Sequence, residues 1–408
     1  MNEVRPRNND STPFLENVRV VDLTRAMAGP FCSMMLADME AEVIKVEPVN
    51  GVGDESRSWG PPFLKGESAY FLSVNRNKRS IVINLTKDNG KKILLRLAQN
   101  TDVFLENFRP GTTLKLGIDY ESLKRINDHI IYCSVSGFGQ SGPEKDKPGY
   151  DIIALASSGM MSITGEPGRP PVKMGVPASD IAAGMYSAYS IVCALLRRKN
   201  TDQGEYIDVG LQDGMISWLT NQAGSFFATG KNPSPSGSAH TTIAPYQAFK
   251  GKDESYFVVA VGNDKLWDDF CKAIGADELR SDKRFETNSE RVENKVELEH
   301  VLQEIFSTDH TSSWVSKISR AGVPCSLIKK LDQVFSDPHV ISRGMLNEVE
   351  HPKLGPIKQI GIPYHFSNFR FQIRSPPPTL GEHTSEILSS LGFSKAEINK
   401  LRAKGVVK

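Results

Sequence analysis

Asp180 is the residue of this chain best placed for chemistry, because it stands where a long apolar stretch begins. The segment reads Gly175-Val-Pro-Ala-Ser-Asp-Ile-Ala-Ala-Gly-Met185, and residues 181–196 are apolar almost all round. This pattern predicts a buried helix with the carboxylate at its positive N-terminal end, which would keep it ionised and able to act as a nucleophile. An aspartate in this position is more often an N-cap that accepts backbone N–H groups, so the segment alone leaves both hypotheses open.

The elements that must position Asp180 follow an α/β pattern. A strand is expected at 18–24, a helix at 30–39 and a strand at 42–46, which together make a βαβ unit. Further strands are expected at 80–84, 102–106 and 130–135, with helices near 87–98 and 112–127. We therefore predict a Rossmann-like large domain with a parallel sheet. No G-x-G-x-x-G follows the first strand, which argues against a nicotinamide or flavin cofactor bound in the usual way.

A Pro/Ser/Gly-rich stretch at 230–238 marks a change of organisation. Strands are expected after it at 245–249 and 256–261, followed by helices through 264–320, which predicts a smaller α+β domain. The predicted organisation is a flexible tail at 1–13, the first part of the large domain at 14–228, the small domain at 229–325 and a return to the large domain at 326–408.

Charge and cysteine usage exclude several classes of protein. Lys plus Arg (49) balance Asp plus Glu (48), so neither nucleic acid nor an anionic membrane surface is expected as a partner. Polar residues interrupt every long apolar run, so no membrane span is expected. The five cysteines lack metal-ligand spacing, which predicts free thiols in a reducing compartment and no metal site. The cytoplasm fits best, with the mitochondrial matrix as the alternative for a processed eukaryotic chain.

Several segments in a fixed order resemble the class III coenzyme A-transferase family, also called the formyl-CoA transferase or carnitine CoA-transferase type. They include Val-Val-Asp-Leu-Thr-Arg-Ala-Met-Ala-Gly-Pro at 20–30, Glu-Asn-Phe-Arg-Pro-Gly at 106–111 and Pro-Gly-Tyr-Asp at 148–151. The other matching segments lie at 42–47, 75–80, 136–143, 175–185, 245–249, 322–324 and 380–384. No single segment is specific, but their order and spacing across nearly the whole chain are.

The resemblance implies that Asp180 is the catalytic nucleophile, because the family's aspartate stands in this helix-opening segment. Its carboxylate would attack the thioester of an acyl-CoA donor and then carry CoA as an aspartyl thioester until a carboxylic acid acceptor takes it. No tightly bound cofactor is implied, and coenzyme A is itself a substrate. Succinyl-CoA with another dicarboxylate or a hydroxyacid is the expected substrate pair, with formyl/oxalate and carnitine-type acceptors as alternatives.

The resemblance also implies a set of binding residues. Positions that line the CoA site in relatives correspond to Met27, Ala28, Leu85, Asn107, Phe108, Arg109 and Lys115. Substrate contacts are implied for Tyr150, for His240 and for the loop at Gly262, which is the candidate for stabilising an oxyanion.

Some of these residues have a simpler interpretation, and one position departs from the family. Without the resemblance, Arg109 and Lys115 would be taken for a solvated helix start. Pro48 stands where some relatives place an arginine for the adenosine end of CoA, so nucleotide contacts there must differ. His383 is a lone histidine and is expected to be structural.

Two other functions remain as alternatives. A 2-methylacyl-CoA racemase of the same superfamily carries a histidine at the position of Tyr150, and tyrosine, with a reference pKa of about 10, is a poor base at neutral pH. A non-catalytic CoA-binding protein would be favoured by an Asp180 that points away from any cleft. The resemblance further implies a homodimer in which each chain threads through its partner.

Overall fold

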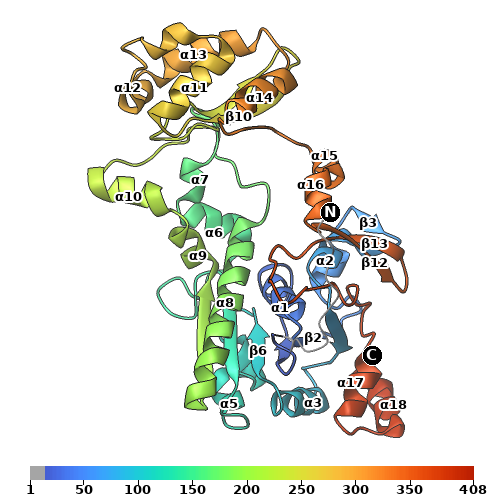
Figure 1. Ribbon diagram of the computed structural model, residues 1–408. Coiled ribbons are helices and arrows are strands. Elements are labelled where there is room, and N and C mark those ends of the chain that lie inside the picture. The colour runs from blue at the N-terminus through green and yellow to red at the C-terminus, as the bar shows by residue number, and fades with distance from the viewer. Residues whose placement is uncertain (1–13) are drawn as a thin grey trace. The chain divides into compact units, whose positions relative to one another are not determined.

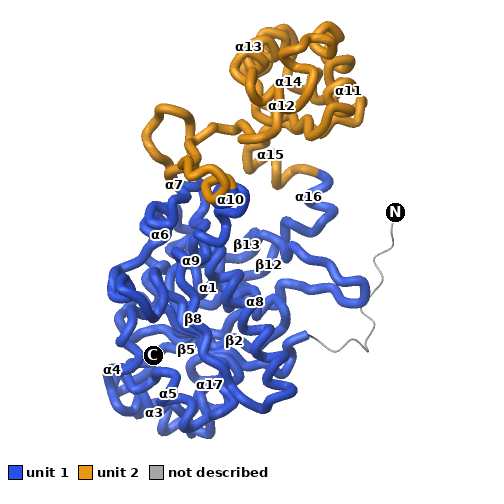
Figure 2. Tube along the Cα trace, turned by 90° about the vertical axis from the view of Figure 1, so that its left-hand side faces the viewer, with its two compact units in different colours: residues 1–160, 173–224, 338–408 blue, residues 161–172, 225–337 orange. Residues whose placement is uncertain are grey.

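The computed structural model describes residues 14–408, which form two compact units (Figures 1 and 2). The first unit, blue in Figure 2, runs up to Met160 and includes Lys173–Gly224 and Pro338–Lys408. The second unit comprises Met161–Val172 and Ser225–Asp337. The predicted tail at 1–13 lies outside the described residues.

The small domain expected at 229–325 falls inside the second unit, which extends beyond it in both directions. The unit also takes in the earlier segment 161–172, because the N–H of Gly237 donates to the carbonyl of Gly165 at 2.9 Å. Because the two residues of this contact lie far apart in the chain, no local sequence pattern could assign 161–172 to the small domain.

The first unit is built on a six-stranded parallel sheet. Its strand order is β5-β2-β1-β6-β7-β8, and every neighbouring pair is parallel. The strands are β1 (Arg19–Asp22), β2 (Glu42–Glu47), β5 (Lys78–Val82), β6 (Val103–Glu106), β7 (Ile131–Ser136) and β8 (Glu205–Gly210). The expected α/β fold with a large parallel sheet is therefore present, and its first five strands overlap the expected ranges.

The sixth strand, β8, is the one that the sequence did not suggest. Its residues Glu-Tyr-Ile-Asp-Val-Gly mix polar with apolar side chains, and their burial alternates over the first four positions. Such alternation is typical of an edge strand with one covered face, whereas inner parallel strands are apolar on both faces.

Helices cover both faces of this sheet (Figure 1). On β1, Val20 belongs to the core under α1 (Ala28–Asp38) and α8 (Ala178–Thr201). Its neighbour Val21 belongs to the core under α3 (Asp88–Ala98) on the other face. Successive side chains of a strand point to opposite faces, so this one strand contributes to both cores.

The C-terminal part of the chain belongs to the first unit. The helices α17 (Thr384–Ser390) and α18 (Lys395–Ala403) join the core that contains Val21. The strands β12 (Leu346–His351) and β13 (Gly355–Ile360) form an antiparallel hairpin before them.

The single helix expected at 112–127 is in fact two short helices, α4 (Thr112–Leu116) and α5 (Tyr120–Lys124). Gly117 ends α4 in the left-handed region with φ of 70°, which glycine adopts at little steric cost. Asp119 then caps α5 by accepting the N–H of Ser122.

The helix α8 packs closely along α1. Gly184 makes this approach possible, because a Cβ at this position would lie 2.6 Å from the carbonyl oxygen of Ala28. By length and composition α8 is also the one described helix that could cross a membrane, with half of its most apolar window buried. A core helix of a globular protein meets the same description. Gly184 follows Asp180 by one turn, so this contact fixes the nucleophile candidate relative to the start of α1.

The second unit has a core of its own. Its antiparallel sheet has the order β11-β10-β9 and comprises β9 (Tyr246–Lys250), β10 (Tyr256–Ala260) and β11 (Cys325–Leu327). The helices packed on it are α11 (Asp264–Ile274), α13 (Lys295–Phe306) and α14 (Thr311–Arg320). The buried Arg291 guanidinium donates to the Ala244 carbonyl at 2.8 Å and to the Asp264 carboxylate at 2.7 Å, which ties the segment before β9 to α11.

Candidate active site

A cavity of about 630 Å³ lies at the carboxyl ends of the parallel strands in the first unit. The strand order turns at β1, because β2 and β6 continue from it toward opposite edges of the sheet. Ligands of open α/β sheets bind at such a switch point. The walls are the loops after β1 and β6, the end of β7 and the starts of α6 (Asp151–Ser157) and α8. All of the lining residues belong to the first unit.

Asp180 is the third residue of α8 and lines this cavity. Within residues 14–408, no hydrogen bond or ion pair holds its carboxylate. Burial raises the pKa of Asp180 to about 7, and the neighbouring carboxylate of Asp151 adds to the rise. Desolvation and the like charge of Asp151 thus oppose the ionising effect that is expected of the helix N-terminus. A carboxylate with a pKa near neutrality is basic yet partly ionised at pH 7, as a nucleophile requires.

Asp151, and not Asp180, supplies the cap of α8. Pro177 precedes the first residue of the helix and offers no side-chain cap. The backbone N–H and the hydroxyl of Ser179 both donate to Asp151 Oδ1, at 2.9 and 2.8 Å. The amides of a helix's first turn have no partners within the helix, and this contact satisfies one of them. The N-cap hypothesis for Asp180 is therefore wrong, and its carboxylate is left for another role.

Tyr70 lines the same cavity and packs edge-on against Trp59, with 5.0 Å between the ring centroids. Burial, and then the carboxylates of Asp180, Asp151 and Asp54, raise the pKa of Tyr70 well above its usual range. Its hydroxyl therefore stays protonated and can donate a hydrogen bond to an anionic group. Neither Tyr70 nor Trp59 lies in a motif or a periodic pattern, so sequence reasoning missed both.

Asn107 joins the two loops that form most of the cavity wall. Its side chain accepts the N–H of Arg25 and donates to the Arg25 carbonyl, each at 2.9 Å. The next residue, Ala26, has φ of 65°, a left-handed conformation that is costly for a residue with a Cβ. Its N–H donates to Asp54 Oδ1 at 3.3 Å, so surrounding contacts maintain the strained loop.

Glu106 supports the loop after β6 from inside the core. Its carboxyl accepts the N–H of Phe108 at 2.8 Å and the hydroxyl of Ser134. Burial raises the pKa of Glu106 to about 7. The Arg25 guanidinium lies over the ring of Phe108, 5.2 Å from the ring centroid. This loop thus presents an aromatic ring and a cation at the edge of the cavity.

The structure brings most of the predicted site residues together. The cavity lining includes Asp180, Tyr150, Met27, Ala28, Asn107, Phe108 and Arg109. It also includes Asp151 and residues that the sequence did not single out for chemistry, namely Arg25, Glu55, Trp59, Tyr70, Ser136, Lys147 and Lys173.

Four predicted residues lie elsewhere in the chain's fold. Leu85 is half-buried against the core under α3, and Lys115 is exposed on α4, so neither lines the cavity. His240 and Gly262 belong to the second unit. His240 accepts the N–H of Thr242 at 3.2 Å and lies edge-on to Tyr246.

His383 makes backbone contacts with β5. Its Nδ1 accepts the N–H of Ser80 at 3.2 Å, and its own N–H donates to the Ser80 carbonyl at 2.9 Å. These contacts join the start of α17 to an edge strand, which is the structural role expected for this histidine.

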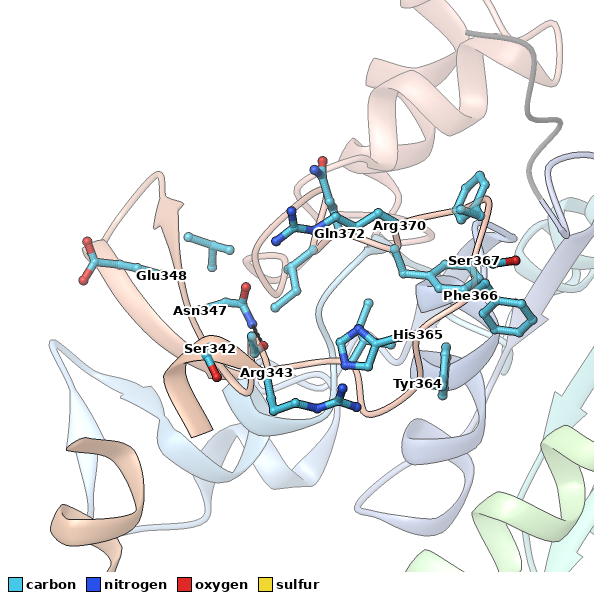
Figure 3. A pocket seen from close by; sticks show the side chains of 16 residues that line it. Ser342, Arg343, Asn347, Glu348, Tyr364, His365, Phe366, Ser367, Arg370 and Gln372 are labelled. Carbon is cyan, nitrogen blue, oxygen red and sulfur yellow. Dashed lines mark hydrogen bonds between the residues drawn. The ribbon is translucent and has the colours of Figure 1, made fainter. Parts of the chain in front are cut away.

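A second cavity, of about 1190 Å³, lies in the C-terminal part of the first unit (Figure 3). Its lining comes from residues within 342–349 and 362–373. In Figure 3 the side chains of Arg343, Asn347 and His365 point into it, whereas that of Glu348 points outward. None of the residues that the sequence suggested for chemistry lines it, so the cavity at Asp180 is the candidate active site.

The fold and the cavity at Asp180 can now be compared with known protein families. A family model described as CoA-transferase family III matches residues 15–384. The chain therefore belongs to this family and is a class III CoA-transferase.

Curated relatives and solved structures are similar over nearly the whole chain. It is 42% identical over 405 residues to the succinyl-CoA:glutarate CoA-transferase of Mus musculus, covering 99% of this chain and 92% of the relative. It is 39% identical over 390 residues to the succinate–glutarate CoA-transferase of Agrobacterium fabrum, covering 93% of this chain and 96% of the relative. The crystal structure of a CAIB/BAIF family protein from Brucella suis aligns with a TM-score of 0.83 and 40% identity, covering 93% of this chain and 99% of that chain.

Proposed function

We propose that this protein transfers CoA from succinyl-CoA to a dicarboxylic acid such as glutarate, with Asp180 as the nucleophile. The observation that carries the proposal is a carboxylate with a pKa of about 7 that no described group engages and that faces a cavity at the switch point of the sheet. The relatives named for succinyl-CoA and glutarate support the choice of donor and acceptor.

The charge of the cavity suits these substrates. Four cationic side chains contribute to its lining, namely Arg25, Arg109, Lys147 and Lys173. CoA brings phosphates, and both acids bring carboxylates, so these cations can hold the anionic ends while Asp180 faces the thioester.

In the first half of the reaction, an Asp180 carboxylate oxygen bonds to the thioester carbonyl carbon and an oxyanion forms. Its collapse breaks the C–S bond, which leaves a succinyl-aspartyl anhydride and the CoA thiolate. The thiolate then bonds to the Asp180 carbonyl carbon of the anhydride and expels succinate. The product is an aspartyl-CoA thioester, formed without net proton transfer.

The second half reverses these steps with the acceptor. A carboxylate oxygen of glutarate attacks the aspartyl-CoA thioester and expels the thiolate, which gives a glutaryl-aspartyl anhydride. The thiolate attacks the glutaryl carbonyl, so glutaryl-CoA leaves and the Asp180 carboxylate returns. Tyr70, whose hydroxyl stays protonated, is a donor of this cavity available to an oxyanion.

The test is to incubate the protein with succinyl-CoA alone and trap the activated carboxyl with hydroxylamine. Peptide mass spectrometry should then find a hydroxamate at Asp180, and the Asp180→Asn variant should bind CoA but form none. An unmodified Asp180 peptide at saturating succinyl-CoA would contradict the proposal. Supplying glutarate, oxalate, formate or carnitine in turn, with detection of the new thioester, identifies the acceptor.

We also propose a homodimer. One face of α8 carries apolar side chains at helical spacing that are between 38% and 70% exposed, namely Met185, Tyr186, Tyr189, Val192 and Leu196. An exposed apolar stripe of this kind in the described first unit is typical of an interface, and a second copy of the chain would bury it. Light scattering should then give about twice the 45.0 kDa chain mass.

For the compartment we propose the cytoplasm or another reducing setting. All five cysteines are free thiols, and Cys32, Cys133 and Cys271 are buried. Burial raises the pKa of Cys133 to about 12, which keeps it protonated and inert. The proposed transfer uses no protein thiol.

A further inference from the structure

Asp151 stands beside the nucleophile candidate in an arrangement that the proposed steps do not use. It opens α6, and its carboxylate accepts both the N–H and the hydroxyl of Ser179, the residue directly before Asp180. The Ser179 hydroxyl also donates to the Asp151 carbonyl at 3.3 Å. Ser179 is fully buried, so water does not compete for these bonds. The position of the first turn of α8 therefore depends on Asp151.

The charge of Asp151 is not neutralised by a cation. Both bonds from Ser179 go to Oδ1, and within residues 14–408 no Lys, Arg or His pairs with this carboxylate. Asp180 itself has no partner in that range. Two neighbouring carboxylates thus face one cavity, one anchored and one free.

We propose that Asp151 is a positioning residue for Asp180: it fixes the first turn of α8 through Ser179, and its unpaired charge makes the free carboxylate a stronger nucleophile. This inference rests on the proposed function of Asp180. A like charge destabilises the ionised carboxylate before attack. During attack the charge of Asp180 passes to the thioester oxygen, so the repulsion is relieved in the transition state and lowers the barrier.

Other titratable and charged groups lie around Asp180. Those that share the cavity lining are Arg25, Glu55, Tyr70, Arg109, Lys147, Tyr150 and Lys173. The helices α1 and α9 (Leu211–Ser217) and the strand β8 also pack on α8. Their acidic residues Asp38, Asp213, Glu205 and Asp208 do not line the cavity. After burial, Asp151 is the described neighbour whose charge raises the pKa of Asp180. The geometry and the electrostatics therefore point to the same residue.

The test compares Asp151→Asn with Asp119→Asn. Asparagine keeps the oxygen that accepts from Ser179 and removes only the charge. Asp119 caps α5 in the same way, by accepting the N–H of Ser122, and does not line the cavity, so it is a matched control. Carbon-13 NMR of protein labelled at the aspartate carboxyl, assigned with Asp180→Asn, reads the titration of Asp180 without turnover. In parallel, the rate of succinate release from succinyl-CoA is measured against pH.

Asp151→Asn is expected to move the NMR midpoint of Asp180 and the acid limb of the rate profile to lower pH, by roughly one unit. The rate on the plateau above the midpoint should fall, because a less basic carboxylate attacks more slowly. Asp119→Asn should leave the midpoint unchanged. Asp151→Ala also loses the anchor, so its plateau rate should lie a further fivefold or so below that of Asp151→Asn.

An Asp180 midpoint in Asp151→Asn equal to that of the wild type, with the hydroxamate still formed at Asp180, would overturn this inference alone. Equal plateau rates for Asp151→Ala and Asp151→Asn would overturn the anchoring role. A wild-type protein that shows the shifted midpoint but forms no adduct would overturn the proposed nucleophile, and with it any catalytic meaning of Asp151.

Discussion

The Lys45 ammonium lies 2.8 Å from Asp54 Oδ2 inside the first unit, and both side chains are almost fully buried. Lys45 also donates to the Thr24 carbonyl at 2.8 Å, and Asp54 accepts the N–H of Ala26. The ion pair therefore holds both ends of the strained loop after β1, which lines the cavity. A buried charge that loses its partner is strongly destabilising, so this pair links the stability of the fold to the shape of the site.

Replacing Lys45 by Met is expected to lower the free energy of unfolding by roughly 3–5 kcal/mol, because Asp54 is left as an uncompensated buried charge. The loop at Ala26 should loosen as well, so affinity for CoA falls. Chemical denaturation and calorimetric titration measure the two effects. The double variant Lys45→Met with Asp54→Asn removes both charges and should recover part of the stability; a double variant less stable than Lys45→Met would contradict the pairing.

The close contact between α1 and α8 gives a second prediction. In Gly184→Ala the new methyl group would meet the Ala28 carbonyl at 2.6 Å, so the helices must separate, at a cost of roughly 1–3 kcal/mol in unfolding free energy. Because Ala28 and Asp180 both line the cavity, the transfer rate should fall more than stability alone explains. Gly224→Ala is the matched control, since α10 (Thr220–Thr229) leaves open space at that position. A Gly184→Ala enzyme with wild-type rate would show that this contact does not set the site.

Arg109 and Lys115 offer a third test, because the resemblance assigns both to CoA whereas the cavity lining contains only Arg109. Arg109→Ala should raise KM for succinyl-CoA by roughly tenfold with little change in kcat, as expected when a charged hydrogen bond to substrate is lost uniformly. Lys115→Ala should raise KM by less. Initial rates measured at one low ionic strength give KM for both variants and show which residue contributes more to CoA binding. An equal or larger effect in Lys115→Ala would place the CoA phosphates over α4.

The sequence predicted the parts of this fold whose signals are local. The short apolar strands β1 and β2 indicated a covered parallel sheet, and the apolar stretch after Asp180 indicated a long buried helix. The edge strand β8 mixes polar with apolar residues and lacks an apolar run, and it was missed.

The site was predictable only where a family motif marks it. Asp180 and the residues at 106–111 stand in such motifs. The cap from Asp151 to Ser179 joins residues 28 positions apart, and the raised pKa of Asp180 depends on how completely the fold desolvates it. Neither can be deduced from local spacing, which is why the N-cap hypothesis for Asp180 was plausible from the sequence and is wrong.

The last prediction is that Asp180→Asn stabilises the protein near pH 8 while it abolishes transfer. An unfolded aspartate ionises near pH 4, whereas burial and then Asp151 raise the pKa of Asp180 to about 7 in the fold. Between these values the unfolded chain binds fewer protons at this residue, so its contribution to stability falls as the pH rises from about 4 to 7. Above that window the loss is complete. Asparagine carries no charge that burial must desolvate, so the Asp180→Asn variant does not lose this stability.

The difference in Tm between Asp180→Asn and the wild type should therefore be small near pH 4, grow up to about pH 7 and then level off. Differential scanning calorimetry at constant ionic strength measures it. Asp119→Asn changes a carboxylate outside the cavity lining and should show no such growth with pH. If the Tm difference for Asp180→Asn were the same at both ends of this range, the carboxylate would titrate at its ordinary value, and the basic nucleophile on which the transfer mechanism rests would be lost.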